Sequence, residues 1–239
     1  MERMETEMNK VKKFVAIIAI LSAIFLCSCA SDETLSSAEV GDTITFGTYE
    51  QDNDQSNGKE PIEWIVLEKS EKSILVISKY GLDYHEYTNV PPVTFAGNYV
   101  IIEEQSDLVQ WQNSTMREWL NSDFMDEAFT SEDKSRLLAT TFISEGNDEY
   151  SDKIFLLHDG EAEEFFPTNA ERRCKATEYA KAQGVNTVQD YCMWWLSTPD
   201  YDVYRGMGYQ YDGSIFYITS NIILGNPAVR PVIFISLES

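Results

Sequence analysis

The chain has 239 residues, of which 43% are hydrophobic and 13% aromatic, so it can fill the core of one ordinary domain. Its formal net charge of −22 at pH 7 disfavours nucleic acid and anionic lipid headgroups as partners. Four cysteines are too few for a scaffold held together by disulfides. The composition therefore predicts a single acidic domain with no nucleic-acid partner.

The N-terminal residues 1–28 are typical of a bacterial lipoprotein signal peptide. A basic segment precedes an apolar run over residues 14–26, which is too short for a comfortable transmembrane helix. The run ends in Leu-Cys-Ser-Cys, and Cys29 follows a small residue, as the lipidated cysteine of a lipoprotein does. A plain secretory signal or an uncleaved anchor is the alternative. We predict that Cys29 carries the lipid.

Residues 29–38 are small and polar, which predicts a flexible tether between the lipid and the folded domain. We place that domain at residues 39–239, because no linker or internal repeat follows the tether. These segments together predict a protein anchored to the cell membrane through Cys29, on its extracytoplasmic side.

The first part of the domain has the pattern of antiparallel strands. Gly41–Tyr49 alternates apolar and polar residues. Ile62–Leu67 and Ser73–Ser78 are rich in strand-forming residues, and the charged link between them predicts a hairpin. Residues 82–110 show no clear period, which predicts a long loop with a short strand at 99–101.

Three short helices are predicted over residues 114–138. Thr130 or Ser131 is suited to cap the third helix, and Leu137 and Leu138 fall on its apolar face. Short elements of this kind are expected to flank a sheet rather than to build a helical bundle.

A buried strand is predicted next at residues 153–157, followed by a short helix at 161–166. The clearest helix of the sequence is predicted at residues 168–183, because Thr168 and Glu171 have the spacing of a capping box and a glycine follows its end.

The C-terminal part predicts three more strand segments. Cys192–Pro199 contains two adjacent tryptophans, residues 203–219 form a hairpin with its turn at Asp212-Gly213, and Val229–Ile235 reads as a buried strand. The whole pattern predicts an α+β fold with a mixed, mostly antiparallel sheet, short flanking helices and long loops.

Four blocks of the sequence resemble a bacterial family called domain of unknown function 6273, and the resemblance covers residues 41–237. The blocks are Phe46–Gln51 with Pro61–Leu67, Ser114–Asn121, Trp194–Pro199 and Val229–Pro231. The family usually has an arginine where this chain has Ser197. The resemblance implies a fold similar to C-type-lectin-like and sulfatase-modifying-factor domains, in which a Trp-bearing strand and the last strand pair centrally. A likeness of fold implies no activity.

Five residues are expected to form the structural core: Trp64, Trp119, Trp194, Trp195 and Arg230. The tryptophans carry the largest apolar surfaces in the chain. Arg230 lies beside the last strand, and we expect a buried guanidinium paired with an acid, because burial of an unpaired charge is costly.

Catalytic motifs are scarce. His85 and His158 lie in no recognisable catalytic or zinc motif, so a structural or surface role is the simpler reading. Cys174 and Cys192 are either bridged, as an exported protein permits, or two buried thiols. A copper-binding pair, as in the oxidase branch of the sulfatase-modifying fold, lacks that branch's closely spaced cysteines. The sequence therefore leaves enzyme activity uncertain and predicts no catalytic residue.

Calcium is the one ion that the acidic loops would suit. Asp52–Gly58 with Glu63 imitates a calcium loop, although the glycine comes one place late and strands flank it. A polar hairpin turn is the favoured reading. Glu103, Glu104 and Asp107 could bind calcium on a long loop, as in some C-type-lectin-like domains. We predict no resident cofactor or metal.

Aromatic residues crowd the segment that follows the Trp strand. Tyr204, Arg205, Tyr209 and Tyr211 are candidate ligand-binding residues, because rings with polar handles suit contact with sugars or proteins. Alternating core residues of a strand are the alternative. The sequence thus favours a lipid-anchored surface module that binds a glycan or a protein, with an envelope enzyme or accessory subunit as the alternative.

Overall fold

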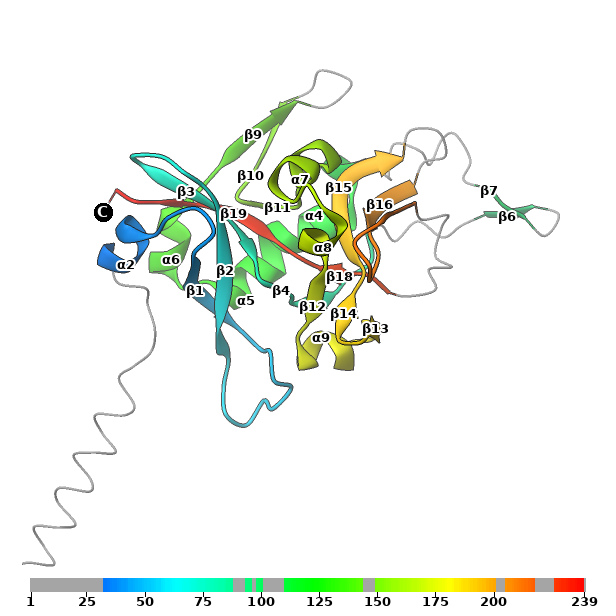
Figure 1. Cartoon of the computed structure of the whole chain (residues 1–239), viewed down its shortest axis with the longest axis horizontal. Helices are drawn as coiled ribbons and strands as arrows, with labels where there is room; N and C mark the ends of the chain where they lie inside the picture. The colour runs from blue at the N-terminus through cyan, green and yellow to red at the C-terminus, as the bar shows by residue number, and fades with distance from the viewer. Residues whose placement is uncertain are drawn as a thin grey trace, which may run out of the picture.

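The computed structural model describes residues 32–87, 93–95, 98–100, 110–143, 149–200, 205–217 and 226–238 (Figure 1). Some predicted features lie outside these residues: Cys29, Glu103, Glu104, Asp107 and Tyr204. The described chain is α+β, with mostly antiparallel sheets and a few short helices, as predicted. Within it, no helix combines the length and the apolar character needed to span a membrane.

The first large sheet contains the predicted N-terminal hairpin and the last strand of the chain. Its order is β1 (Thr43–Tyr49), β2 (Glu60–Lys69), β3 (Ser73–Ser78), β19 (Val232–Ser236) and β11 (Ile154–Phe155), and β8 (Leu137–Leu138) also pairs with β19. Every pairing is antiparallel. The inner strands β3 and β19 are almost continuously apolar because both faces are covered.

The second large sheet contains the Trp strand. Its order is β17 (Ile215–Tyr217), β16 (Arg205–Tyr209), β15 (Trp194–Asp200), β18 (Ala228–Val229) and β5 (Asp83–Tyr84). The predicted hairpin is confirmed, with Gly213 at a φ of +82° in its turn. The predicted strand 229–235 is divided at Arg230-Pro231, where proline lacks a donor. Its two parts belong to different sheets, so this dipeptide lies where the sheets meet.

The helix predicted at residues 168–183 is wrong. The chain forms α8 (Asn169–Arg172), β12 (Cys174–Ala176) and α9 (Glu178–Ala182) instead. The capping box at Thr168 is present, but Cys174 and Ala176 are buried on one face of a strand while Lys175 is exposed. Pairing in a small third sheet outweighs helix propensity here. That sheet has the order β13 (Thr187–Val188), β14 (Tyr191–Cys192), β12 and β4 (Tyr80–Gly81).

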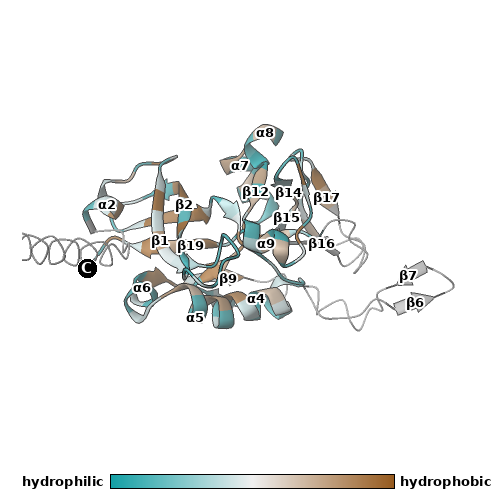
Figure 2. Ribbon diagram, turned by 90° about the horizontal axis from the view of Figure 1, so that it is seen from below, coloured by the Kyte–Doolittle hydropathy of each residue, from teal (hydrophilic) through white to brown (hydrophobic). Residues whose placement is uncertain are grey.

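Short helices cover the sheets, and Figure 2 shows α6, α5 and α4 following one another along one side of the molecule. The described helices outside the third-sheet segment are α2 (Asp32–Ser37), η2 (Trp111–Asn113), α4 (Thr115–Trp119), η3 (Leu120–Phe124), α5 (Met125–Ala128), α6 (Ser131–Arg136) and α7 (Asp159–Phe165). Leu137 and Leu138, predicted on a helix face, form β8 beside the last strand. Two hairpins complete the described elements: β6 (Val93–Phe95) with β7 (Asn98–Val100), and β9 (Thr140–Ile143) with β10 (Glu149–Asp152).

The tether predicted at residues 29–38 differs from the structure over its second half. Residues 32–37 form α2, and Leu35 and Ala38 are buried in the core. Burial of the leucine side chain stabilises the fold by more than the conformational entropy lost when this segment becomes ordered. The folded body therefore includes part of the segment that its composition assigned to the tether.

Three of the four expected core tryptophans are fully buried. Trp64 Nε1 donates to the Phe46 carbonyl at 2.7 Å, and Trp194 Nε1 donates to the Arg172 carbonyl at 2.8 Å. Trp195 is also buried, with its ring 5.3 Å from the Tyr87 ring. Trp119 is only half-buried at the edge of the core. The bulk of the prediction is thus confirmed, with Trp119 displaced toward the surface.

Candidate functional site

Cys174 and Cys192 face each other across the third sheet. They lie directly opposite in the antiparallel pair of β12 and β14, and both are buried, with exposed fractions of 2% and 0%. Opposite residues in such a pair have Cα atoms about 4.5–5.5 Å apart, which falls inside the range of about 4.4–6.8 Å seen for disulfides. The thiols are unbridged in this structure. The strand register would accommodate either a disulfide between Cys174 and Cys192 or two buried thiols, the two states that the sequence left open.

Arg230 is buried as expected, and its contacts among the described residues are a carbonyl and two aromatic rings. Its exposed fraction is 2%, and its Nε donates to the Ser78 carbonyl at 2.9 Å. Its guanidinium lies 4.8 Å from the Trp194 ring and 5.1 Å from the Phe166 ring. Its Nη1 atom has no hydrogen-bond partner among the described residues, and no described carboxylate forms an ion pair with it. Within the part of the chain that the structure describes, two aromatic faces lie against the guanidinium and stabilise its charge.

The charge of Arg230 acts on the two thiols. Burial by itself raises the pKa of Cys174, but the hydrogen bond with Cys192, the Arg230 charge and the Gly81 amide outweigh burial and lower that pKa to about 7. The contact with Cys174, followed by burial, raises the pKa of Cys192. The pair therefore releases one proton readily and holds the second.

A surface of aromatic and cationic side chains lies on the outside of the same strands. We call Arg173, Lys175, Tyr191 and Tyr211 the Tyr191 surface. The Arg173 guanidinium lies 3.5 Å from the centre of the Tyr191 ring, and its Nε donates to the Tyr211 carbonyl at 3.2 Å. Lys175 Nζ lies 5.7 Å from the same ring. The half-buried Tyr191 is thus held in place by a cation on an otherwise acidic protein.

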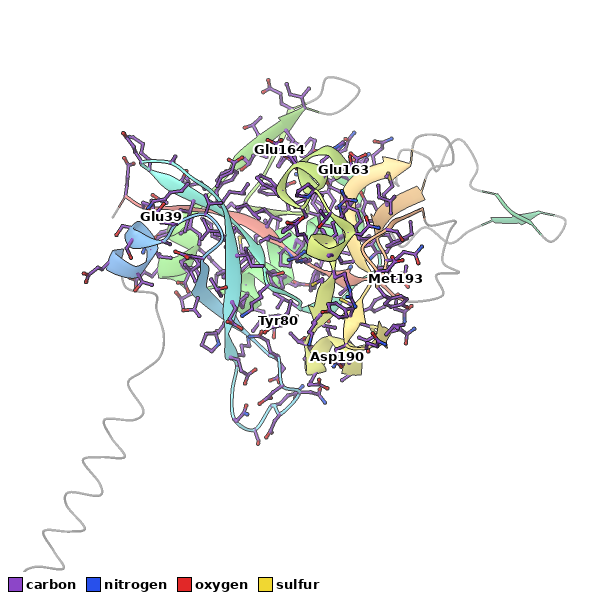
Figure 3. All side chains as sticks on the ribbon, in the orientation of Figure 1. Glu39, Tyr80, Glu163, Glu164, Asp190 and Met193 are labelled. Carbon is purple, nitrogen blue, oxygen red and sulfur yellow. The ribbon has the colours of Figure 1, made fainter. Side chains whose placement is uncertain are left out.

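The turn next to this surface is strained. Gln189 and Asp190 connect β13 to β14 with φ angles of +53° and +68°. Two residues with positive φ match the twist of a tight hairpin, but side chains other than glycine and asparagine rarely adopt this conformation. Figure 3 labels Asp190 near the lower edge of the molecule. Such strain is found where a loop must present its neighbours in one geometry.

A family model described as a domain of unknown function, DUF6273, matches residues 71–237. The chain belongs to the DUF6273 family. The cysteine pair, Arg230 and the Tyr191 surface all lie inside the matched DUF6273 region, whereas β1 and β2 precede it. No curated protein and no solved structure matches the chain.

The tyrosines that the sequence singled out in the DUF6273 domain separate into different environments. Tyr209 is fully buried, 5.0 Å from the Trp194 ring, and burial raises its pKa to about 12. It therefore belongs to the core, because alternate residues of β16 face inward. Arg205 begins β16 opposite Asp200. Tyr211 is half-buried and joins the Tyr191 surface through its carbonyl.

Sequence reasoning missed Arg173, Lys175 and Tyr191. These residues flank the two cysteines, and the helix predicted over residues 168–183 hid the strand that brings them together. Pairing Cys174 with Cys192 as opposite strand residues would have placed Lys175 opposite Tyr191. That signal was present in the sequence.

Both histidines serve local structure. His85 stacks on Trp119 with ring centres 4.6 Å apart. The His158 ring caps α7 by accepting from the Gly160 amide at 3.4 Å and lies 2.6 Å from the Asp159 carboxylate. Neither contact creates a catalytic arrangement with a nucleophile.

The loop whose sequence imitates a calcium motif has a different set of neighbouring acids from the one its spacing suggested. Glu63 pairs with Lys79 at 2.9 Å. Asp52 instead lies close to Glu50 and Glu60, the group of described residues that could hold a metal ion. The acids of the loop therefore converge, but with partners that the motif did not include.

Proposed function

We propose that this DUF6273 protein is a lipid-anchored module on the outer side of the cell membrane that binds a glycan or a protein. The observation that carries the proposal is the Tyr191 surface, where a half-buried ring is held by Arg173 beside a strained turn. The lipoprotein-like N-terminus supports the location.

The chemistry of the Tyr191 surface suits recognition. Tyrosine offers an apolar face for a sugar ring or an apolar side chain, and a hydroxyl for hydrogen bonds. Aromatic residues and arginine are the side chains most enriched in the centres of protein interfaces. A ring already held at 3.5 Å from a guanidinium loses little freedom when a ligand binds.

We also propose that the fold is of the C-type-lectin-like type. Support comes from the parallel contact of the Trp strand β15 with β18 at Trp194 and Ala228, and from the inner position of β19 in the first sheet. The resemblance implied that the Trp strand pairs with the last strand; β15 pairs with β18, the first part of that predicted strand, whereas β19 lies in the other sheet.

The alternative function, an envelope enzyme or accessory subunit, required two adjacent cysteines in an open cleft. Cys174 and Cys192 are adjacent, but both are enclosed by the core. A substrate or a copper ion would have to displace packed side chains to reach them. This burial favours the binding module.

Binding is tested with the full-length protein in mild detergent, screened against cell-wall polysaccharides, host glycans and extracellular proteins. We expect at least one ligand, with affinity reduced at least about tenfold in Tyr191→Ala, the size expected for one aromatic anchor. Tyr150→Ala is the matched control, because Tyr150 also lies under an arginine, Arg117 at 4.9 Å, on a different hairpin. A complete screen without a ligand, or equal loss in both variants, would refute the proposal.

The anchor is tested by labelling cells with a radioactive fatty acid. We expect the label on the wild-type protein and none on Cys29→Ser, which should leave the membrane fraction. Label that persists on Cys29→Ser would refute lipidation at this residue.

A further inference from the structure

Three carboxylates converge at the base of the loop between β1 and β2, the long connection at the lower edge of Figure 1. Glu50 follows β1 directly, Asp52 begins the loop, and Glu60 is the first residue of β2. One oxygen atom of each side chain lies within 4.8 Å of the others. Closing the hairpin thus brings together three negative charges that the sequence separates.

Glu50 is the unusual member of the group. Its exposed fraction is only 6%, and its buried Oε1 atom has no hydrogen-bond partner among the described residues. Other buried carboxylates of the chain are partnered, since Asp83 accepts from Tyr49 and Asp152 accepts from Trp111 and Arg117. Desolvation first, and then the charges of Glu60 and Asp52, raise the pKa of Glu50. An enclosed, unpartnered carboxylate oxygen beside two like charges calls for a positive partner.

No side chain of the described residues supplies that partner. The nearest lysine in the sequence, Lys59, instead bonds to the Glu127 carbonyl at 2.8 Å and to its carboxylate at 3.3 Å. None of the ion pairs formed by the described lysines and arginines includes Glu50, Asp52 or Glu60. The charge of the cluster is therefore uncompensated by any side chain in the part of the chain that the structure describes.

The loop backbone holds two of the carboxylates in position. The Gln51 and Asp52 amides donate to Glu60 Oε2 at 2.8 and 3.4 Å. Asp52 accepts from the Asp54 amide and from Asn57 Nδ2, both at 2.8 Å. Helix α9 supports the loop from outside, because the Tyr179 amide donates to the Gln51 carbonyl at 3.0 Å. A cation would therefore meet oxygens that are already gathered.

We propose that Glu50, Asp52 and Glu60 bind a calcium ion. All three ligands are hard carboxylate oxygens, which suit Ca²⁺ rather than zinc or copper. Calcium bonds to oxygen at about 2.3–2.6 Å, so one ion spans oxygens up to about 5 Å apart, and it accepts water in its remaining positions. The site precedes the region matched by the DUF6273 model and does not depend on the proposed binding function.

The test titrates the full-length protein, freed of metal with a chelator, with Ca²⁺ by calorimetry and with Tb³⁺ by luminescence. We expect one calcium ion to bind with a dissociation constant of about 10⁻⁴–10⁻³ M, the range of extracellular calcium modules, and to raise the melting temperature. Tb³⁺ luminescence should be sensitised by Tyr179, which contacts the loop. We expect Asp52→Asn and Glu60→Gln each to weaken binding at least about tenfold, because each removes a charged ligand.

Glu68→Gln is the matched control, because Glu68 is an exposed acid on the same strand as Glu60. It should bind calcium as the wild type does. Without calcium, the two cluster variants should melt at or above the wild-type temperature, since each removes like-charge repulsion. No calcium binding at millimolar concentration, or unchanged affinity in both cluster variants, would overturn the proposal. Glu50→Gln provides an independent third variant with the same expected loss.

Discussion

The two large sheets differ in whether some of their buried side-chain donors lack a partner among the described residues. In the first sheet, the Trp64 indole donates to a carbonyl, and Tyr49 donates to the Asp83 carboxylate. In and beside the second sheet, the Trp195 indole, the Tyr209 hydroxyl and Arg230 Nη1 have no hydrogen-bond partner among the described residues. The side chains compared are all buried, so the difference lies in polar pairing and not in burial.

This difference indicates where the molecule gives up stability. A buried polar group without a partner costs about 1–3 kcal/mol relative to a paired one. One of the unpaired groups, Arg230, influences both thiols of the cysteine pair. Native proteins concentrate such unsatisfied groups at functional sites. The second sheet is therefore the region in which substitutions should reveal function, whereas those in the first should reveal stability.

The largest effect is expected where a well-partnered buried group is removed. Asp152 accepts from Arg117 Nε at 2.7 Å and from Trp111 Nε1 at 3.1 Å. Asp152→Ala leaves both donors unpaired, and we expect it to lower the free energy of unfolding by about 3 kcal/mol. Chemical denaturation followed by tryptophan fluorescence measures the change.

A surface ion pair of the same length provides the control. Lys134 and Asp126 also meet at 2.7 Å, but the Asp126 side chain is 75% exposed. Asp126→Ala should cost less than about 1 kcal/mol, because water screens the pair. Equal losses in the two variants would show that burial does not set the strength of the Arg117 contact.

Two tyrosine hydroxyls offer a direct comparison of the sheets. Tyr49→Phe removes the donor to Asp83 and leaves a buried carboxylate short of a partner, so we expect a loss of about 1–3 kcal/mol. Tyr209→Phe removes a hydroxyl that has no partner, so stability should stay within about 0.5 kcal/mol or rise. Thermal melts of the two variants in one buffer measure both changes. A larger loss in Tyr209→Phe would mean that its hydroxyl is satisfied in solution.

The sequence predicted elements whose local pattern and tertiary pairing agree. In the β2–β3 hairpin, the apolar residues are buried as the sequence pattern predicts for paired strands. At Thr168, the capping box begins a helix as predicted. The helix predicted at residues 168–183 was wrong because the local pattern and the tertiary pairing disagree there. After Arg172, helix propensity continues, but Cys174 pairs across the sheet with a residue 18 positions later. The strand is identified only by its long-range pairing, because the local pattern of apolar residues does not predict it.

The candidate site was predictable to a similar degree. Composition correctly placed Trp194, Trp195 and Arg230 in the core. It could not tell that aromatic rings rather than an acid would surround Arg230, because Phe166 comes from a distant helix end. Nor could spacing reveal that Glu50 and Glu60 meet Asp52, since their approach depends on how the hairpin closes.

A small change in stability, and the sharpest test of the second sheet, is expected for Arg230→Met. Methionine fills similar space without an unpaired charge, so stability at pH 6 should change by less than about 1 kcal/mol. The clearer effect should be on the pKa of the Cys174 thiol. Burial alone raises the pKa of Cys174, and the Arg230 charge is one of the contacts that bring it to about 7, so its pKa should rise in the variant.

The pH dependence of stability follows from this shift. A thiol titrating at about 7 when folded, and at its ordinary value of 9.0 when unfolded, keeps its proton longer in the unfolded chain. Stability of the wild type should therefore rise from about pH 7 to about pH 9 under reducing conditions. Arg230→Met and Cys174→Ser should both flatten this rise, measured as melting temperature against pH. If the rise survives in Cys174→Ser, another group produces it. If it survives only in Arg230→Met, the contact with Cys192 suffices to lower the pKa, and the unpaired guanidinium has no role in thiol chemistry.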